Sequence, residues 1–381
     1  MELLFNDEEQ TLVEAVREYV ARDVAPRVSD RDEAGSYPSE ELRAAASMGF
    51  MGMAVPEDDG GFPLSATSTA IVYEEISRAS ASVAVILSVH NSLTCNAIDQ
   101  YGSPDVKGRL LPRLASGALI GAYCLTESQA GSDVSAIQTR AIGDGDDWRI
   151  SGQKAFITSG AHAGVYIVFA VTDLEARTSR RMTAFVVERE TPGIEVAPKE
   201  RKLGLLASEI NGITFDNVVV PDANVLGEVG GGFGVAMSLL ATGRIGIAAQ
   251  AVGIAQAALD AGLAYAKDRK QFGKAIAEYQ AIQWKLADMA TEIDAARLLV
   301  RQAALLKDAG SDYVRQASQA KLFASELATR AAGHAIQIHG GYGYIRDYGV
   351  ERLYRDAKAT ELYEGTSEIQ RLVIARQLLG Q

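Results

Sequence analysis

Cysteine and histidine are scarce in this 381-residue chain, and neither forms a recognisable ligand pattern. The two cysteines, Cys95 and Cys124, are too few for a disulfide framework or a thiolate metal cage. None of the four histidines has metal-ligand spacing with another histidine or with a cysteine. Even His334 and His339 lie five residues apart on an apparent helix and so face different sides. We therefore expect the cysteines to be small buried residues and the histidines to serve packing or surface hydrogen bonds.

Positive charge is also in short supply. Lys and Arg number 37 against 49 Asp and Glu, which gives a net charge of -12. A surface without surplus cations cannot neutralise many phosphates, so nucleic acid and anionic membranes are excluded as main partners. An anionic ligand stays possible where a few basic residues gather at one site.

Long apolar runs and basic leader segments are absent by inspection. We find no run that approaches the ~20 apolar residues needed to span a bilayer. The first nine residues, Met1 to Glu9, carry acid where a signal or transit peptide carries base. The sequence therefore predicts a cytoplasmic protein.

Three common catalytic or cofactor motifs are missing too. No complete G-x-G-x-x-G follows a strand, and no G-x-x-x-x-G-K-[ST] is present. No G-x-S-x-G motif indicates a serine hydrolase. A bound cofactor must therefore have a signature of another kind.

Periodicity divides the chain into three regions, as the length suggests. Helical spacing of apolar residues in 1–118 predicts a helical domain, which Asn6 and Glu9 open with a capping box. Short β-branched runs bounded by Gly, Asp and Pro in 119–228 predict an antiparallel β-sandwich or small barrel. Long Ala- and Leu-rich helical stretches in 229–381 predict an antiparallel four-helix bundle.

The individual elements can be placed approximately. The sequence predicts strands within 155–158, 165–171, 183–187 and 212–220. It predicts the bundle helices over 233–268, 279–308, 311–338 and 366–379. The fold class is therefore mainly α with a central β domain.

Four segments in colinear order resemble the acyl-CoA dehydrogenase family. They are CLTESQAGSD at 124–133, KAFIT at 154–158, QIHGGYGY at 337–344 and YEGTSEIQ at 363–370. The similarity covers nearly the whole chain. It implies the three-part fold described above, a bound FAD, and α,β-dehydrogenation of acyl-CoA thioesters to trans-2-enoyl-CoA.

The resemblance assigns the catalytic base to Glu364, and the chemistry supports that choice. The reaction removes a very weakly acidic proton α to a thioester and moves a hydride from the β carbon to a flavin. A carboxylate with a reference pKa of ~4.3 is a poor base until desolvation raises that value. Glu364 precedes a helix that Thr366 is expected to cap. Alone, the same pattern is an ordinary surface turn, and the other matched segments favour the functional interpretation.

The resemblance also assigns residues to the flavin. Thr126 and Thr158 supply hydrogen bonds to the ring, and Phe156 stands where many relatives carry Trp. Arg269 matches a position that binds the FAD diphosphate, for which the planar guanidinium is suited. In the family this part of the FAD is bound partly across a subunit interface. The full predicted cofactor-binding set is Tyr123, Leu125, Thr126, Ser132, Phe156, Thr158, Arg269, Phe272, Gln280, Gln337, Gly340, Gly341, Thr366 and Glu368.

The substrate residues implied in the same way are Ser132, Arg244, Tyr363 and Gly365. Two positions depart from the family pattern. Gly243 occupies the place where some relatives carry the base, which leaves Glu364 as the candidate. Ala241 stands where several relatives carry Asp or Asn along the pantetheine chain.

Segments 88–93 and 243–250 are most similar to short-chain and short branched-chain members, in fatty acid β-oxidation or branched-chain amino acid catabolism. The resemblance implies an electron-transferring flavoprotein as acceptor and a homotetramer built as a dimer of dimers. Two alternatives stay open: an acyl-CoA oxidase of the same fold, and a non-catalytic acyl-CoA-binding helical assembly.

Overall fold

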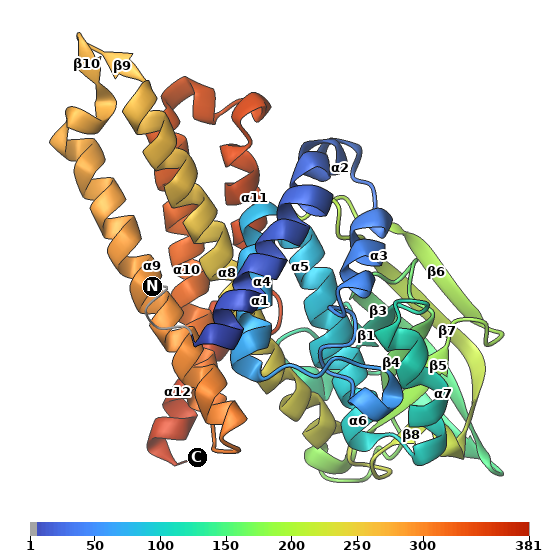
Figure 1. Ribbon diagram of the computed structural model, residues 1–381. Coiled ribbons are helices and arrows are strands. Elements are labelled where there is room, and N and C mark those ends of the chain that lie inside the picture. Colours follow the sequence, from blue (N-terminus) through green and yellow to red (C-terminus); the bar gives the residue numbers. More distant parts are fainter. Residues whose placement is uncertain (1–5, 381) are drawn as a thin grey trace.

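The computed structural model describes residues 6–380. A helical bundle and a β-sheet lie on opposite sides of the molecule, with the N-terminal helices between and in front of them (Figure 1). This arrangement confirms the mainly helical fold with a central β domain. The domain boundaries after residues 118 and 228 stay a prediction.

The N-terminal region is entirely helical. The predicted capping box is present, because the Asn6 side chain accepts from the Glu9 amide and the Glu9 carboxylate accepts from the Asn6 amide. A π-helical stretch, Val89–Cys95, is wholly buried and joins two of the helices. The α-helices are α1 (Asp7–Tyr19), α2 (Val28–Ala34), α3 (Ser39–Ser47), α4 (Ala66–Ala79), α5 (Ala81–Ser88), α6 (Asn96–Tyr101) and α7 (Pro104–Ala115).

Eight strands form one sheet in the order β6-β7-β3-β2-β4-β5-β8, with β1 paired to β4. Their bounds are β1 (Gly121–Cys124), β2 (Arg140–Asp144), β3 (Asp147–Thr158), β4 (Val165–Val171), β5 (Met182–Glu188), β6 (Ile194–Lys199), β7 (Ile210–Pro221) and β8 (Val225–Leu226).

Most of these pairs are antiparallel as expected, but β1 runs parallel to β4, and β2 meets β4 in a single parallel pair. A parallel pair needs a long connection, and the β2–β3 hairpin lies within the one between β1 and β4. All seven residues of β4 are buried, which fits its uninterrupted apolar sequence.

The C-terminal region contains all four predicted helices, three long and one short, and one further short helix over 350–360. The helix over 350–360 was not predicted, because its apolar positions are few and most of its residues are charged or polar. The helices are α8 (Gly232–Asp268), α9 (Gln280–Asp308), α10 (Val314–His339), α11 (Val350–Thr360) and α12 (Ser367–Leu379), and the short strands β9 (Lys270–Gln271) and β10 (Lys274–Ala275) form a hairpin between α8 and α9.

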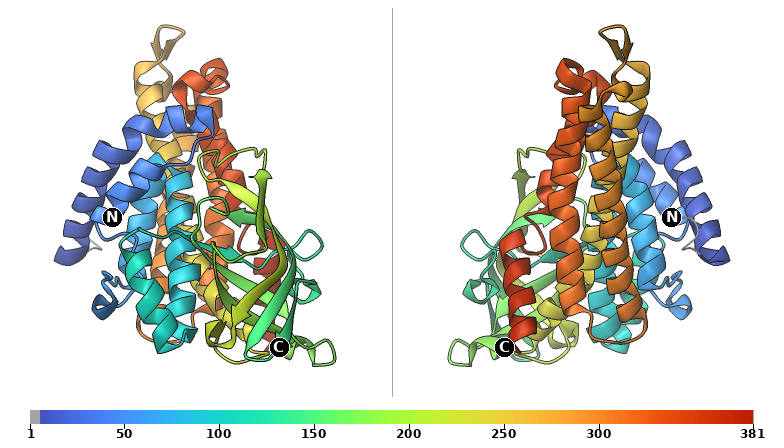
Figure 2. Two further views of the ribbon diagram at one scale, coloured as in Figure 1. Left: turned by 90° about the vertical axis from the view of Figure 1, so that its right-hand side faces the viewer. Right: turned by 90° about the vertical axis from the view of Figure 1, so that its left-hand side faces the viewer.

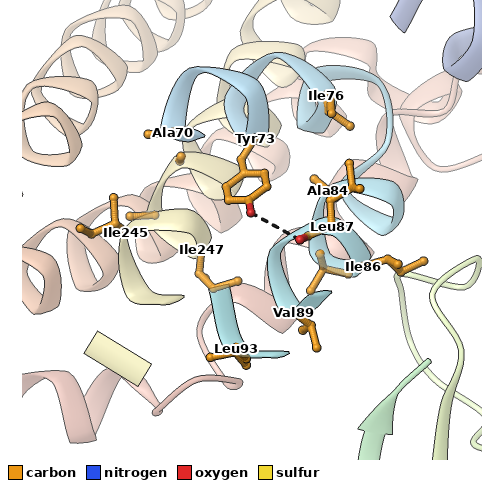
Figure 3. Close-up of a cluster of buried hydrophobic side chains, with 14 of the residues drawn as sticks. Ala70, Tyr73, Ile76, Ala84, Ile86, Leu87, Val89, Leu93, Ile245 and Ile247 are labelled. Carbon is orange, nitrogen blue, oxygen red and sulfur yellow. Dashed lines mark hydrogen bonds between the residues drawn. The ribbon is translucent and has the colours of Figure 1, made fainter. Parts of the chain in front are cut away.

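The central helix α8 packs against α4, α9 and α10. Figure 3 shows the core where α4, α5 and α8 meet around Tyr73, whose hydroxyl donates to the Leu87 carbonyl. Ile245 and Ile247 of α8 belong to the same buried cluster. Both cysteines are buried in the cores, as expected.

Two helical stretches correct the expectation that no apolar run is long enough to span a membrane. Ala81–Tyr101 and Gly232–Asp268 pass that test by length and composition. Their most apolar windows are 94% and 78% buried inside the protein. They are apolar because they are surrounded by other elements of the fold, as core helices of large domains are.

Candidate active site

Glu364 lies in the turn between α11 and α12, and its backbone is left-handed, with φ of 51°. Gly365 follows with φ of 95°. The predicted cap is present, since the Thr366 side chain accepts from the Ile369 amide and begins α12. A glutamate in this region costs about 1 kcal/mol, so the surrounding contacts must hold the turn.

Two side chains hold that turn through its carbonyl groups. The Lys321 ammonium on α10 donates to the Gly365 carbonyl at 2.8 Å. The Gln370 amide on α12 donates to the same carbonyl at 2.9 Å and to the Glu364 carbonyl at 3.2 Å. The Glu364 side chain is thereby left with a fixed direction.

The Glu364 carboxylate points at Gly243 on α8. A Cβ added at Gly243 would lie 2.1 Å from Oε2 of Glu364, closer than any real contact. Because Gly243 has no side chain, the Glu364 carboxylate has the space that it occupies.

Both carboxylate oxygens of Glu364 are buried and have no hydrogen-bond partner in the structure. Burial raises the pKa of Glu364 to about 7, against the opposing effect of the positive charges on Lys321 and Arg244. An orphaned buried carboxylate is unusual, because such groups are normally paired. A pKa near neutrality suits a group that both accepts and releases a proton.

Arg244 brings a second charge to the carboxylate from α8. Its side chain is buried, Nη1 donates to Ser318 Oγ at 3.3 Å, and Nε has no partner. Burial lowers the pKa of Arg244, while Glu364 acts in the opposite direction. The predicted substrate residue therefore lies beside the predicted base.

Further polar groups without partners surround this carboxylate. The Tyr123 hydroxyl on β1 is buried and unbonded, and its pKa is raised by burial first and by the Glu364 charge second. Ser88 Oγ is also unbonded and lies 2.9 Å from where a Cβ of Gly246 would stand. Buried groups left unsatisfied together indicate a place for a ligand.

Tyr363 and Gln250 form one wall of this region. The Tyr363 hydroxyl donates to Gln250 Oε1 at 2.5 Å, and Gln250 Nε2 donates to the Ala81 carbonyl at 2.8 Å. Gln250 is buried, and its side chain both donates and accepts a hydrogen bond, so it ties α8 to the start of α5. Sequence reasoning singled out Tyr363 but not the role of Gln250.

The predicted flavin-facing residues of the β domain also lie together. A bulge interrupts the β3–β7 ladder between Lys154 and Ile157, and Phe156 takes φ of 58° there. Its ring is 60% exposed. The Ala155 amide donates to the Thr126 carbonyl at 2.9 Å, which joins the two motif segments. Leu125 is buried beside them, and Thr158 ends β3.

A buried ion pair fixes this part of the sheet. Lys154 donates to Glu127 at 2.8 Å and to the Leu125 carbonyl at 3.0 Å. Glu127 also accepts from the amides of Gln138 and Thr139. Burial alone would raise the pKa of Glu127, but Lys154 and these hydrogen bonds lower it to about 2. Both residues stood inside the recognised motifs, yet their pairing was not predicted.

A second group of predicted residues lies elsewhere. Arg269, Gly340 and Gly341 line a hollow of about 420 Å³ together with Tyr265 and Tyr342. The Arg269 guanidinium lies 5.3 Å from the centre of the Tyr342 ring. A Cβ at either glycine would meet no atom within 4 Å, so their backbone is open to a ligand.

The remaining predicted residues are on the surface. Phe272 is 95% exposed at the β9–β10 turn, and Gln280 begins α9. Gln337 is exposed near the end of α10, and Glu368 and Ser132 are exposed as well. The β9–β10 hairpin stands at the far end of the bundle, away from the sheet, in all three views (Figures 1 and 2). One chain therefore does not bring the two groups of flavin residues together.

Comparison with known proteins identifies the family. Residues 6–118, 122–218 and 230–379 match the models of the N-terminal, middle and C-terminal domains of acyl-CoA dehydrogenase. An acyl-CoA dehydrogenase of Bacillus subtilis is 48% identical over 365 residues, which cover 96% of each chain.

Two solved structures are similar throughout. Butyryl-CoA dehydrogenase from Megasphaera elsdenii has a TM-score of 0.96 and 41% identity, covering 98% of this chain and 99% of that one. A structure described with the electron transferring flavoprotein of Acidaminococcus fermentans, in a study of flavin-based electron bifurcation, has a TM-score of 0.97 and 40% identity, covering 100% of both chains. The chain belongs to the acyl-CoA dehydrogenase family and is an FAD-dependent oxidoreductase that acts on acyl-CoA thioesters.

Proposed function

We propose that this protein converts short acyl-CoA thioesters to trans-2-enoyl-CoA, with Glu364 removing the α proton. The observation that supports this most is the buried, unpartnered carboxylate of Glu364, whose pKa burial raises to about 7. A base of that kind is ionised often enough to accept a proton and basic enough to hold it. The Glu364 backbone amide is proposed to polarise the thioester carbonyl.

The residues present fit FAD. When bound, FAD supplies the acceptor for the hydride from the β carbon. The exposed Phe156 ring offers a stacking face, and Thr126 and Thr158 flank it on the paired segments. The open glycines beside Arg269 suit a diphosphate, because backbone amides and a guanidinium can both reach its oxygens.

We propose that these two parts serve one cofactor only when two copies associate. The β9–β10 hairpin, which directly follows Arg269, stands at the far end of the bundle, away from the sheet that contains Phe156 in β3 (Figures 1 and 2). The bundle also exposes large apolar side chains that fit a protein interface. On α9 and α12 these are Trp284, Leu298, Leu305, Leu372, Leu378 and Leu379. A dimer of dimers, the predicted homotetramer, is the proposed assembly.

The preference for short chains rests on the Gln250–Tyr363 wall. Gln250 is buried between α8 and the first residue of α5 and makes both of its hydrogen bonds there. We propose that this hydrogen-bonded pair limits the length of the acyl chain that fits beside Glu364. The similarity to butyryl-CoA dehydrogenase supports the same length. An electron-transferring flavoprotein is the proposed acceptor of the electrons.

A panel of acyl-CoA substrates tests the proposal. Purified, FAD-loaded protein is mixed without oxygen with acyl-CoAs of increasing length and with methyl-branched ones, and loss of the flavin absorbance is followed. We expect the fastest bleaching with short chains, and gains of about tenfold or more for longer chains in Gln250→Ala. No bleaching with any acyl-CoA would contradict the proposal, and rapid recolouring in air would identify an oxidase instead.

A further inference from the structure

Lys321 is an unusual cation in the core. It lies in the first third of α10, it has no solvent exposure, and its buried neighbours on that helix are small residues. Among residues 6–380, no carboxylate comes within ion-pair distance of its ammonium. A buried cation without a paired anion is costly, so its retention needs a reason.

Its one hydrogen bond leads directly to the base. Lys321 Nζ donates to the Gly365 carbonyl at 2.8 Å, one residue after Glu364. The ammonium is therefore bound to the backbone of a left-handed turn rather than to the carboxylate. This leaves both carboxylate oxygens without a partner while a positive charge remains close to them.

The electrostatic effect acts in both directions. Burial lowers the pKa of Lys321 to about 8, and the charge that opposes this most is Glu364. Burial raises the pKa of Glu364, and the charge that opposes this most is Lys321. The other groups that interact electrostatically with this pair are Arg244 on α8, Tyr73 on α4, Tyr123 on β1, Tyr363 in the turn, and Glu361 and Glu368 on either side of it.

We propose that Lys321 is a positioning residue for the reaction: it holds the turn that aims Glu364 and supplies a positive charge that favours the ionised carboxylate without bonding to it. The inference rests on the proposed role of Glu364. A direct ion pair would give the same charge but would occupy the oxygens that must accept the proton. Because the ammonium donates to the Gly365 carbonyl, it supplies the charge and leaves the carboxylate oxygens unoccupied.

The sign of the pH effect follows. Proton abstraction needs the ionised carboxylate, so the rate rises with pH through the pKa of Glu364. Removing a nearby positive charge disfavours ionisation and raises that pKa further. The rising part of the pH profile should therefore move to higher pH when Lys321 loses its charge.

The test compares Lys321→Met and Lys321→Gln with Lys321→Arg and Gln370→Met. Gln370 binds the same carbonyl without a charge, so its variant reports the mechanical role alone. Two quantities are measured: the pH midpoint of anaerobic flavin bleaching, and the pH at which the infrared carboxyl band absent from Glu364→Gln is half lost. Thermal unfolding shows which variants fold. If Lys321→Met does not fold, Lys321→Gln, which keeps a hydrogen-bond donor, takes its place.

We expect both midpoints to rise by about one unit in the uncharged Lys321 variants, to return in Lys321→Arg, and to stay in place in Gln370→Met. At a pH below the wild-type midpoint this equals bleaching about tenfold slower. If the midpoints do not move in the folded uncharged variants, the proposed role of Lys321 is wrong, and the proposed role of Glu364 is unaffected. Substantial bleaching by Glu364→Gln would overturn the proposed base itself, so the two failures can be told apart.

Discussion

The Glu364 turn and the Arg269 hollow are both predicted parts of one reaction centre, yet the chain builds them differently. At Glu364, residues from α8, α10 and α12 surround one carboxylate and leave its oxygens free inside the protein. At Arg269, the guanidinium, two open glycines and the exposed Phe272 stand at the surface. In the proposed function, the first region binds the substrate, and the second binds the cofactor together with a further copy of the chain.

This difference has a physical origin. A base with a raised pKa requires burial, which a single chain can provide with its own core. A dinucleotide is long and charged, and it binds to backbone amides and cations that must stay open until it arrives. Changes in the two regions should therefore have different signatures: loss of chemistry in the first, and loss of cofactor affinity in the second.

The largest effect is expected from Glu364→Gln. The amide keeps the size of the side chain but cannot accept the α proton, so anaerobic bleaching by butyryl-CoA should slow by about a thousandfold or more. FAD affinity should stay unchanged, because the side chain does not line the Arg269 hollow. Glu361→Gln removes a nearby carboxylate that is paired with Lys358, and it serves as the control. Equal slowing in both variants would argue against a specific role for Glu364.

Gly243→Ala comes next. The added Cβ would stand 2.1 Å from the carboxylate, so Glu364 must move. A displacement of about 1 Å lowers the rate about a hundredfold, although Ala is the better helix former. Bleaching rate and thermal unfolding are measured beside Gly234→Ala, whose Cβ would meet nothing within 4 Å on the same helix. A fully active Gly243→Ala would show that the carboxylate has other room.

The smallest of the three effects is expected at the hollow. Arg269→Ala removes a charge from a diphosphate site, which should weaken FAD binding by about tenfold or more. The bleaching rate of the FAD-saturated variant should change little. Arg371→Ala, which breaks an exposed pair between Arg371 on α12 and Glu326 on α10, is the control for titration of the apoprotein with FAD. Unchanged FAD affinity in Arg269→Ala would remove the hollow from the cofactor site.

Much of the fold could be predicted from local sequence. The Asn6 capping box, the Thr366 cap and the long helices have signals within a few residues, and the structure confirms them. The parallel β1–β4 pair could not be predicted, since parallel partners are distant in sequence and have no turn between them. The short helix α11 was missed because its apolar positions are few and most of its residues are charged or polar.

The residues of the site also fall into those with a local sequence signal and those without one. Glu364, Arg244 and Tyr363 were found because they stand in motifs, and the structure brings them together. Lys321 and Gln250 were missed, because a buried lysine on a helix or a glutamine in an Ala-rich one has no local signature. Only the folded chain shows that Lys321 reaches a carbonyl 44 residues away. The Phe156 bulge likewise depends on the register between β3 and β7.

The central claim is that Glu364 is a buried, unpaired carboxylate poised between its two protonation states. The most direct measurement is the infrared titration of the wild-type protein, with Glu364→Gln subtracted to isolate one carboxyl band. Because burial raises the pKa, the band should persist well above the range of ordinary glutamates and be half lost near pH 7. Half loss near pH 4 would contradict the account, since it would mean that the carboxylate is solvated or paired.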